Sequence, residues 1–121
     1  KVADDYAGED AIDEFGGCEY KSTIGKNVNG TYNGISVQDT WDDQCRYIIE
    51  DKIGKYEHHY YARFDGGRVA EVWKLDANNV LKILLPKIKK QFDEGTSHKK
   101  DPRIGVSIGQ KEIESYGQRI R

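Results

Sequence analysis

The sequence has no methionine, only two cysteines, only two prolines and no long apolar run. A membrane-spanning helix needs roughly 18 to 20 consecutive apolar residues, so we expect a soluble protein that does not cross a membrane. The absence of methionine and of an apolar leader after Lys1 is expected if a signal peptide has been removed, and equally if the sequence has been trimmed. The length of 121 residues suits one domain with a modest core.

The two cysteines, Cys18 and Cys45, are too few for a disulfide-rich scaffold, and their spacing matches no zinc pattern. One disulfide between them would fit an oxidising compartment. Two buried thiols are the alternative, because cysteine is also a small apolar residue. We therefore expect a disulfide in a secreted protein, and we expect neither a metal ion nor a cofactor.

The charge of the chain is distributed unevenly, although its net value is only −2. Residues 1–65 carry 7 Lys and Arg against 14 acids, whereas residues 66–121 carry 12 against 7. A basic second half suits a phosphate-bearing partner, but a solvated charged surface explains it as well. Charge alone therefore favours nucleic acid only weakly.

Two parts of the chain are expected: an acidic arm over residues 1–15 and a single domain over residues 16–121. The arm has six acids, one lysine and little to bury, so we expect a mobile segment or an added edge strand. Residues 18–35 contain several Gly and Asn-Gly turn signals and predict a hairpin. Asn29 in this stretch also begins a glycosylation sequon.

The clearest helix is predicted from Val37 to Glu50. Ser36 fits an N-cap, with an acid three residues later as in a capping box. Asp42 and Asp43 are expected to face solvent. The apolar residues recur at spacings of three and four on one face: Val37, Trp41, Cys45, Ile48 and Ile49.

Most of the chain after Lys55 is expected to be strand, with a charged loop over residues 89–102. Apolar residues at 80, 84, 88 and 92 also have helical spacing, but Pro86 argues against a helix there. The predicted fold class is α+β, with one α-helix packed on a curled antiparallel sheet and an N-terminal hairpin. The predicted strands cover residues 56–64, 68–75, 80–88, 103–108 and 112–120, the last two forming a closing hairpin.

The segment from Tyr56 to Gly66 combines two histidines with four aromatic rings. Strand alternation places His58 and Tyr60 on one face, and His59 and Tyr61 on the other. Imidazoles can donate to phosphate oxygens, and aromatic rings can stack on bases. Local physics alone favours a plainer interpretation, a tyrosine-rich strand over a small core with its histidines in solvent.

This segment resembles the Tyr-Pro-His-x-aromatic motif, followed by an aromatic-acid-Gly run, of the fungal guanyl-specific ribonucleases and ribotoxins. Upstream, Tyr32, Val37 and the run Cys45-Arg46-Tyr47 fall at the spacing of that family. Downstream, Asp101-Pro102-Arg103-Ile104 is similar to the strand that carries the catalytic arginine of the family. The likeness covers roughly residues 30–120 and implies a microbial ribonuclease-like fold.

The resemblance implies a role for each matched position. Tyr56, His58 and Arg103 would lie against the scissile phosphate. Tyr60 and Phe64 would hold a guanine between their rings, and Asp65 would accept hydrogen bonds from its Watson–Crick edge. If RNA binds, lysines of the basic second half are expected to contact its phosphates, namely Lys89, Lys90, Lys99 and Lys100.

Two departures from the family concern proton transfer. The general base would lie two residues before the strand proline, where Leu84 stands, and an alkyl side chain cannot take a proton. No histidine occurs in the last predicted strand, where the family has its general acid. Glu71 and His98 are the residues that could replace the missing pair.

These departures resemble those of the secreted ribonuclease-like effectors of plant-pathogenic fungi. We therefore expect a secreted, monomeric virulence or avirulence protein without ribonuclease activity, acting inside host cells. Its expected partner is host RNA or a host protein, a plant immune receptor included. The alternative is an active secreted endoribonuclease or ribotoxin with rearranged catalytic groups, and an unrelated β-rich domain is the third interpretation.

Overall fold

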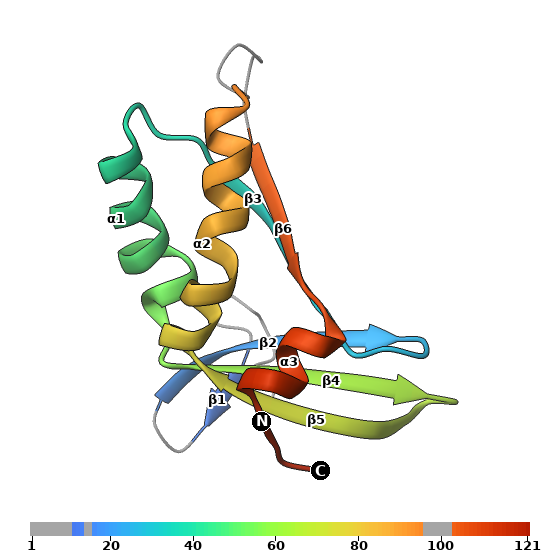
Figure 1. The fold of residues 1–121 in the computed structure, drawn as a ribbon. Helices are drawn as coiled ribbons and strands as arrows, with labels where there is room; N and C mark the ends of the chain where they lie inside the picture. Colours follow the sequence, from blue (N-terminus) through green and yellow to red (C-terminus); the bar gives the residue numbers. More distant parts are fainter. Residues whose placement is uncertain (1–10, 14–15, 96–102) are drawn as a thin grey trace.

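The computed structural model describes residues 11–13, 16–95 and 103–121. The described strands are β1 (Ala11–Asp13), β2 (Gly16–Ile24), β3 (Gly30–Ser36), β4 (His58–Asp65), β5 (Arg68–Asp76), β6 (Arg103–Ile108) and β7 (Gln118–Arg119). The described helices are α1 (Trp41–Asp51), the short 3-10 helix η1 (Ile53–Lys55), α2 (Ala77–Asp93) and α3 (Gln110–Tyr116). Figure 1 shows α1 and α2 side by side above the larger sheet, with β3 and β6 running along α2.

The strands form two sheets. The larger one has the order β1-β2-β4-β5-β7, and β3 pairs with β6 in a separate two-stranded sheet. β2 and β4 are parallel, with Glu19 opposite His59 and Lys21 opposite Tyr61, and the other described pairs are antiparallel. Because β3 and α1 lie between β2 and β4 in sequence, this parallel pairing places residues about forty positions apart side by side in the sheet.

Helix α1 confirms the predicted helix but begins four residues later than expected. Thr40 is the N-cap, and its Oγ1 accepts a hydrogen bond from the backbone N–H of Asp43 at 3.1 Å. Ser36, the predicted cap, instead ends β3. The fully buried Gln44 anchors the residues between β3 and α1, because its Oε1 accepts from Gln38 N at 2.8 Å and its Nε2 donates to Ser36 O at 3.1 Å.

Helix α2 contradicts the strand predicted over residues 80–88. Asp76 caps it by accepting from Asn79 N at 2.9 Å, so the predicted turn is the start of a helix. Val80, Leu84 and Ile88 are fully buried along one side of it. Burying each aliphatic side chain contributes about 1.5 to 3 kcal/mol, which together outweighs the roughly 3 kcal/mol that an interior proline costs. Pro86 itself lies on the exposed side of the helix.

The two predicted hairpins are wrong. Residues 18–35 supply strands to different sheets, because β2 pairs with β4 and β3 pairs with β6. At the C-terminal end, β6 is a strand as expected, but residues 110–116 form α3 and β7 pairs with β5. The expected Gly66-Gly67 turn is confirmed, with both glycines at positive φ of 58° and 79°.

The α+β class is therefore confirmed, and its expected details are corrected. The described chain has three α-helices where one was expected, and its larger sheet is mixed where a purely antiparallel one was expected. The mixed sheet was not predicted because the local sequence pattern of β2 does not indicate which strand it will pair with. Within residues 1–15, Ala11–Asp13 form an edge strand on β2, and residues 1–10 and 14–15 lie outside the described part.

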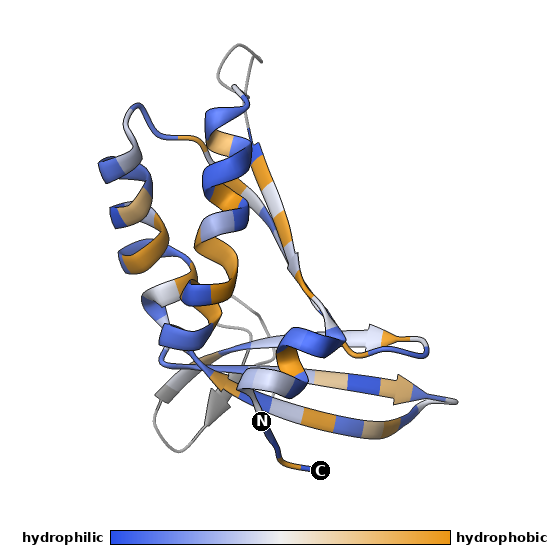
Figure 2. Cartoon of the chain, in the orientation of Figure 1, coloured by the Kyte–Doolittle hydropathy of each residue, from blue (hydrophilic) through white to orange (hydrophobic). Residues whose placement is uncertain are grey.

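The core lies where α2 meets the two sheets. Fully buried residues come from α2, from β6 and from the inner face of β4 and β5, with Tyr61 the largest of them. Figure 2 shows hydrophobic residues on the facing sides of α2 and the β3–β6 pair. Gly30 permits this packing, because a Cβ there would lie 2.5 Å from the ring of Tyr61.

The expected disulfide is absent from the structure. Cys18 belongs to β2 in the sheet and Cys45 to α1 in the helical layer, and both are thiols. Cys18 is buried and Cys45 half-buried, as in the alternative interpretation of the two cysteines. In the described residues no helix is long and apolar enough to span a membrane.

Candidate functional site

The structure contains a pocket of about 300 Å³ between β2, β3 and the segment that joins α1 to β4, here called pocket A. Four buried side chains form its floor: Tyr32, Ile35, Ile53 and Tyr56. Charged side chains of β2, of the end of α1 and of η1 form its rim. Pockets of this size lie at the small end of those that hold ligands.

A buried hydrogen-bond network lies beneath pocket A. The hydroxyl of Tyr32 lies 2.8 Å from His59 Nδ1 and 2.6 Å from the hydroxyl of Tyr61. His59 Nε2 lies 2.8 Å from the carbonyl of Ile53. A carbonyl only accepts, so Nε2 carries the proton and Nδ1 accepts from Tyr32, whose oxygen in turn accepts from Tyr61. Each of these bonds thus has a defined donor.

The network is uncharged. Burial lowers the pKa of His59 from 6.5 to about 4, although the backbone carbonyls of Ile53 and Tyr56 act in the opposite direction. Burial likewise raises the pKa of Tyr61 well above its ordinary value. Both groups are therefore neutral at physiological pH, and they serve to fix the floor of the pocket. The expectation that both histidines face solvent is wrong, because His58 is 9% exposed and His59 1%.

The rim of pocket A carries three lysines with different surroundings. Lys21 forms an ion pair with Glu19 at 2.8 Å and lies over the ring of Tyr32, 4.6 Å from its centre. Lys52 and Lys55 lie beside tyrosine rings at 5.7 and 5.3 Å and form no ion pair with any described carboxylate. Two cations at the rim are thus available to an anionic group.

A second pocket of about 370 Å³, here called pocket B, lies where the start of β4, the end of β5 and the segment after α3 meet. Glu57, His58, Lys74, Asp76 and Tyr116 line it. Asp76 uses one carboxylate oxygen to cap α2, and Tyr116 is 46% exposed at the rim. Pocket B therefore surrounds the buried His58 with carboxylates, an ammonium group and a phenol hydroxyl.

The structure distributes the residues implied by the ribonuclease resemblance over separate places. Tyr56 lies in the floor of pocket A, whereas His58 lines pocket B. Arg103 begins β6, is exposed and pairs with Ser36 in the two-stranded sheet. Leu84 is fully buried in α2. The three expected phosphate contacts are thus not lined up along one sheet.

Tyr60 and Phe64 lie on the same face of β4, as strand alternation predicts, with Tyr20 beside Tyr60 on β2. They are four residues apart, which in a strand is about 13 Å. One base could not fill that separation, since stacked rings lie about 4.5 to 7 Å apart. Asp65 ends β4 and is exposed opposite Arg68.

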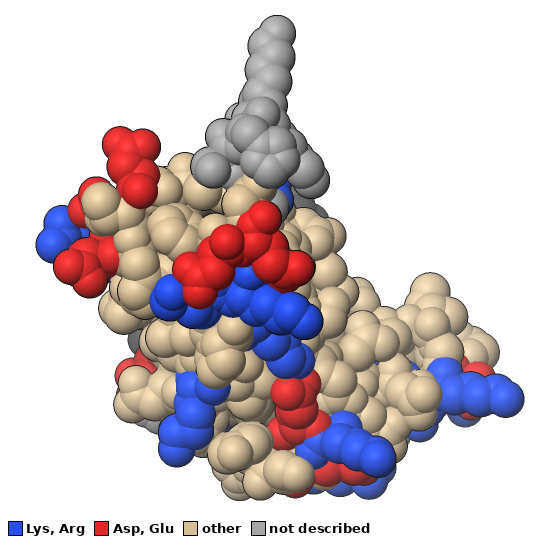
Figure 3. All heavy atoms as spheres, turned by 45° about the horizontal axis from the view of Figure 1, so that its top comes forward, with Lys and Arg blue, Asp and Glu red and all other residues tan. Residues whose placement is uncertain are grey.

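The structure describes two of the four lysines that were expected to bind RNA. Lys89 forms an ion pair with Asp93 at 2.7 Å and lies over the ring of Trp41, and Lys90 is exposed nearby on α2. Lys99 and Lys100 lie outside the described residues, as does His98. Figure 3 shows acidic and basic side chains next to one another on the face in view, with no large area of one sign.

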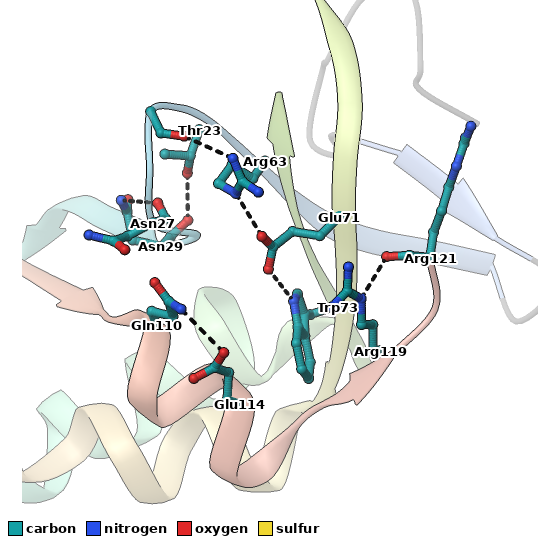
Figure 4. A network of polar contacts seen from close by, with 11 residues as sticks. Thr23, Asn27, Asn29, Arg63, Glu71, Trp73, Gln110, Glu114, Arg119 and Arg121 are labelled. Atoms are coloured by element: carbon teal, nitrogen blue, oxygen red, sulfur yellow. Dashed lines mark hydrogen bonds and ion pairs between the residues drawn. The ribbon is translucent and has the colours of Figure 1, made fainter. Parts of the chain in front are cut away.

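Glu71, the other residue considered as a substitute base, belongs to a polar network on β4 and β5 (Figure 4). It accepts from Arg63 Nε at 2.6 Å and from Trp73 Nε1 at 2.7 Å. Burial alone would raise the pKa of Glu71, but these bonds and the charge of Arg63 lower it below its ordinary value. Glu71 is therefore held ionised by two partners, which makes it a weak base.

No protein-family model and no curated protein matches the chain. Of the residues that line pocket A, sequence reasoning singled out only Tyr32 and Tyr56, and it missed the rim lysines Lys21, Lys52 and Lys55. A partial signal was present, because alternation placed His59 and Tyr61 on one face of their strand. Nothing local indicated that β3 would bring Tyr32 to that face from 27 residues away.

Proposed function

We propose that the chain is a secreted ribonuclease-like effector that acts by binding a partner and does not cleave RNA. The observation that carries this proposal is the dispersal of Tyr56, His58 and Arg103 over pocket A, pocket B and the two-stranded sheet. Proton transfer and phosphate contacts accelerate a reaction only when the groups surround one reacting atom. A protein with these groups apart is better suited to binding.

The surroundings of pocket A favour a protein partner over RNA. Helix α1, which ends at the rim, carries four acids and one arginine, Arg46. The phosphates of RNA carry one negative charge per nucleotide, so this helix would repel a strand running across the pocket. Lys87 and Lys89 of α2 are already paired with Glu112 and Asp93. A protein surface, which carries both signs, complements such a mixed surface.

The thiols agree with action inside a host cell after secretion. Cys18 and Cys45 are not joined by a disulfide, and the cytosol keeps thiols reduced. The fold therefore does not depend on a disulfide that the reducing host cytosol would break.

A cleavage assay tests the proposal directly. We expect the purified protein to leave total RNA and guanosine-containing dinucleotides intact, under conditions in which an active guanyl-specific ribonuclease degrades both. The physical reason is the missing proton-transfer pair, because general acid and base groups each contribute about 10²- to 10⁴-fold to such reactions. Clear cleavage that disappears in His58→Ala would contradict the proposal.

Pocket B supports a second candidate, an endoribonuclease with rearranged groups. It places His58 with the carboxylate of Glu57, the ammonium of Lys74 and the hydroxyl of Tyr116. If RNA is cleaved, this candidate requires the activity to fall in both His58→Ala and Glu57→Gln. It should survive in Glu71→Gln, because Glu71 belongs to the Arg63–Trp73 network rather than to the pocket.

A further inference from the structure

We infer that pocket A binds an aromatic side chain with a neighbouring carboxylate, presented by a partner protein. This inference rests on the proposed function and names the chemistry of the partner. It combines three observations: a preformed buried floor, two rim lysines without a described carboxylate partner, and a size suited to one side chain.

The floor of the pocket suits an aromatic ring. Tyr32, Ile35 and Ile53 are 6%, 2% and 3% exposed, so their positions are fixed by the core beneath them. The His59 network adds rigidity, since it joins Tyr32 of β3 to the Ile53 carbonyl of η1 across the base of the pocket. Rigid pockets of this kind receive the aromatic anchors that dominate binding energy at protein interfaces.

The rim of the pocket suits a carboxylate beside that ring. Lys52, which precedes η1, and Lys55, which ends it, are exposed, while Lys21 and Glu19 neutralise each other on β2. A carboxylate next to the anchor can therefore pair with Lys52 and Lys55 without competing with an existing ion pair. Glu19 and Asp51 remain as acceptors for backbone N–H groups of the bound segment.

The mixed charge of the rim decides between a peptide and a nucleic acid. A peptide segment supplies N–H donors for the two rim carboxylates and a carboxylate for the two lysines. A polynucleotide brings a negative charge with every nucleotide and meets the acidic α1 as it leaves the pocket. The floor of pocket A could hold the ring of a side chain or of a base, and the charges of its rim favour a protein segment.

Binding of designed peptides to the full chain tests the inference. The probe is an acidic pentapeptide with a central tyrosine, titrated while the backbone amide signals of residues 52–56 are followed by NMR. The comparison peptide has alanine in place of the tyrosine. We expect the tyrosine peptide to bind at least about tenfold more tightly, because only its ring fills the floor.

A pair of charge-reversal variants separates the pocket from general electrostatics. Lys52→Glu with Lys55→Glu should weaken binding of the tyrosine peptide at least about tenfold. Lys82→Glu with Lys111→Glu makes the same change in net charge at exposed positions of α2 and α3, and should change it by less than about twofold. All four lysines are exposed, so both variants should fold, which the amide spectrum checks.

Several results would overturn the inference. Equal binding of the tyrosine and alanine peptides, equal loss in both double variants, or no response of residues 52–56 would each do so. A single-stranded oligouridine that binds at these residues, when the tyrosine peptide does not, would assign the pocket to nucleic acid. None of these results bears on cleavage, so the proposed function is judged separately by the RNA assay.

Discussion

Two adjacent histidines of β4 lie in opposite environments. His59 is 1% exposed, makes hydrogen bonds through both ring nitrogens and lies beneath pocket A. His58 points to the other face of the strand and lines pocket B beside Glu57 and Lys74. The residue singled out by its motif is His58, whereas the residue that joins β3 to η1 beneath pocket A is His59.

The different surroundings of the two histidines follow from the alternation of side chains along a strand. Side chains alternate between faces, so a shift of one residue moves a side chain from a core network to a polar pocket. On the inner face, His59 joins two layers of the fold through Tyr32 and Ile53. We therefore expect changes at His59 to cost more stability than changes at His58, which also alter the lining of pocket B.

Replacing each histidine by alanine should give the largest contrast. His59→Ala leaves the Ile53 carbonyl and the Tyr32 hydroxyl without a partner and opens a cavity, so the free energy of unfolding should fall by about 3 to 5 kcal/mol. His58→Ala should lower it by about 1 kcal/mol. Urea unfolding followed by tyrosine and tryptophan fluorescence measures both values. Equal losses of unfolding free energy in the two variants would show that the two histidines contribute equally to stability.

The pH dependence of stability should sharpen the same contrast. The pKa of His59 is about 4 in the folded protein, against 6.5 for an ordinary histidine. Between these values the unfolded chain binds a proton that the folded protein does not, so stability decreases as pH falls from 6.5 and levels off below 4. The total decrease should be about 3 kcal/mol.

Unfolding measured from neutral pH down to pH 4 in the native protein and in His59→Gln isolates this contribution. Other titrating groups affect both proteins alike, so the difference between the two curves belongs to His59. Glutamine retains a donor and an acceptor, which limits the structural change. If the two curves run parallel throughout this range, the buried imidazole does not determine acid stability.

Within the His59 network, the smallest loss of stability is expected from its outer end. Tyr61→Phe removes the hydroxyl that donates to Tyr32 but keeps the buried ring. Because one hydrogen bond is lost and the Tyr32 oxygen keeps its role as donor to His59, the loss should be about 1 kcal/mol. Thermal unfolding of this variant beside His59→Ala measures it. A loss as large as that of His59→Ala would mean that Tyr61 controls the position of Tyr32.

Much of the fold near each strong local signal was predictable. The apolar spacing around Ile48 predicted α1, and the aromatic run and the Gly66-Gly67 pair predicted the β4–β5 hairpin. The same spacing rule applied to Val80, Leu84 and Ile88 would have given α2, but the proline was given more weight than the buried face. Its ring lies on the exposed side, where the cost is smaller than the gain from burial.

The site was less predictable than the fold. The ribonuclease resemblance implied that Tyr56 and His58 contact one phosphate, whereas the structure assigns them to different pockets. Lys21 and Lys52 were not selected, because each is an ordinary lysine in its own segment. Only their meeting around the floor of pocket A distinguishes them.

The sequence by itself determined the α+β class, the first helix and the alternation that separates His58 from His59. These follow from local periodicity and from side-chain chemistry. The tertiary structure alone decided that β2 pairs in parallel with β4 and that β3 crosses Tyr61 at Gly30. Such pairings are set by the burial of whole faces against distant segments, so no single segment of sequence contains them.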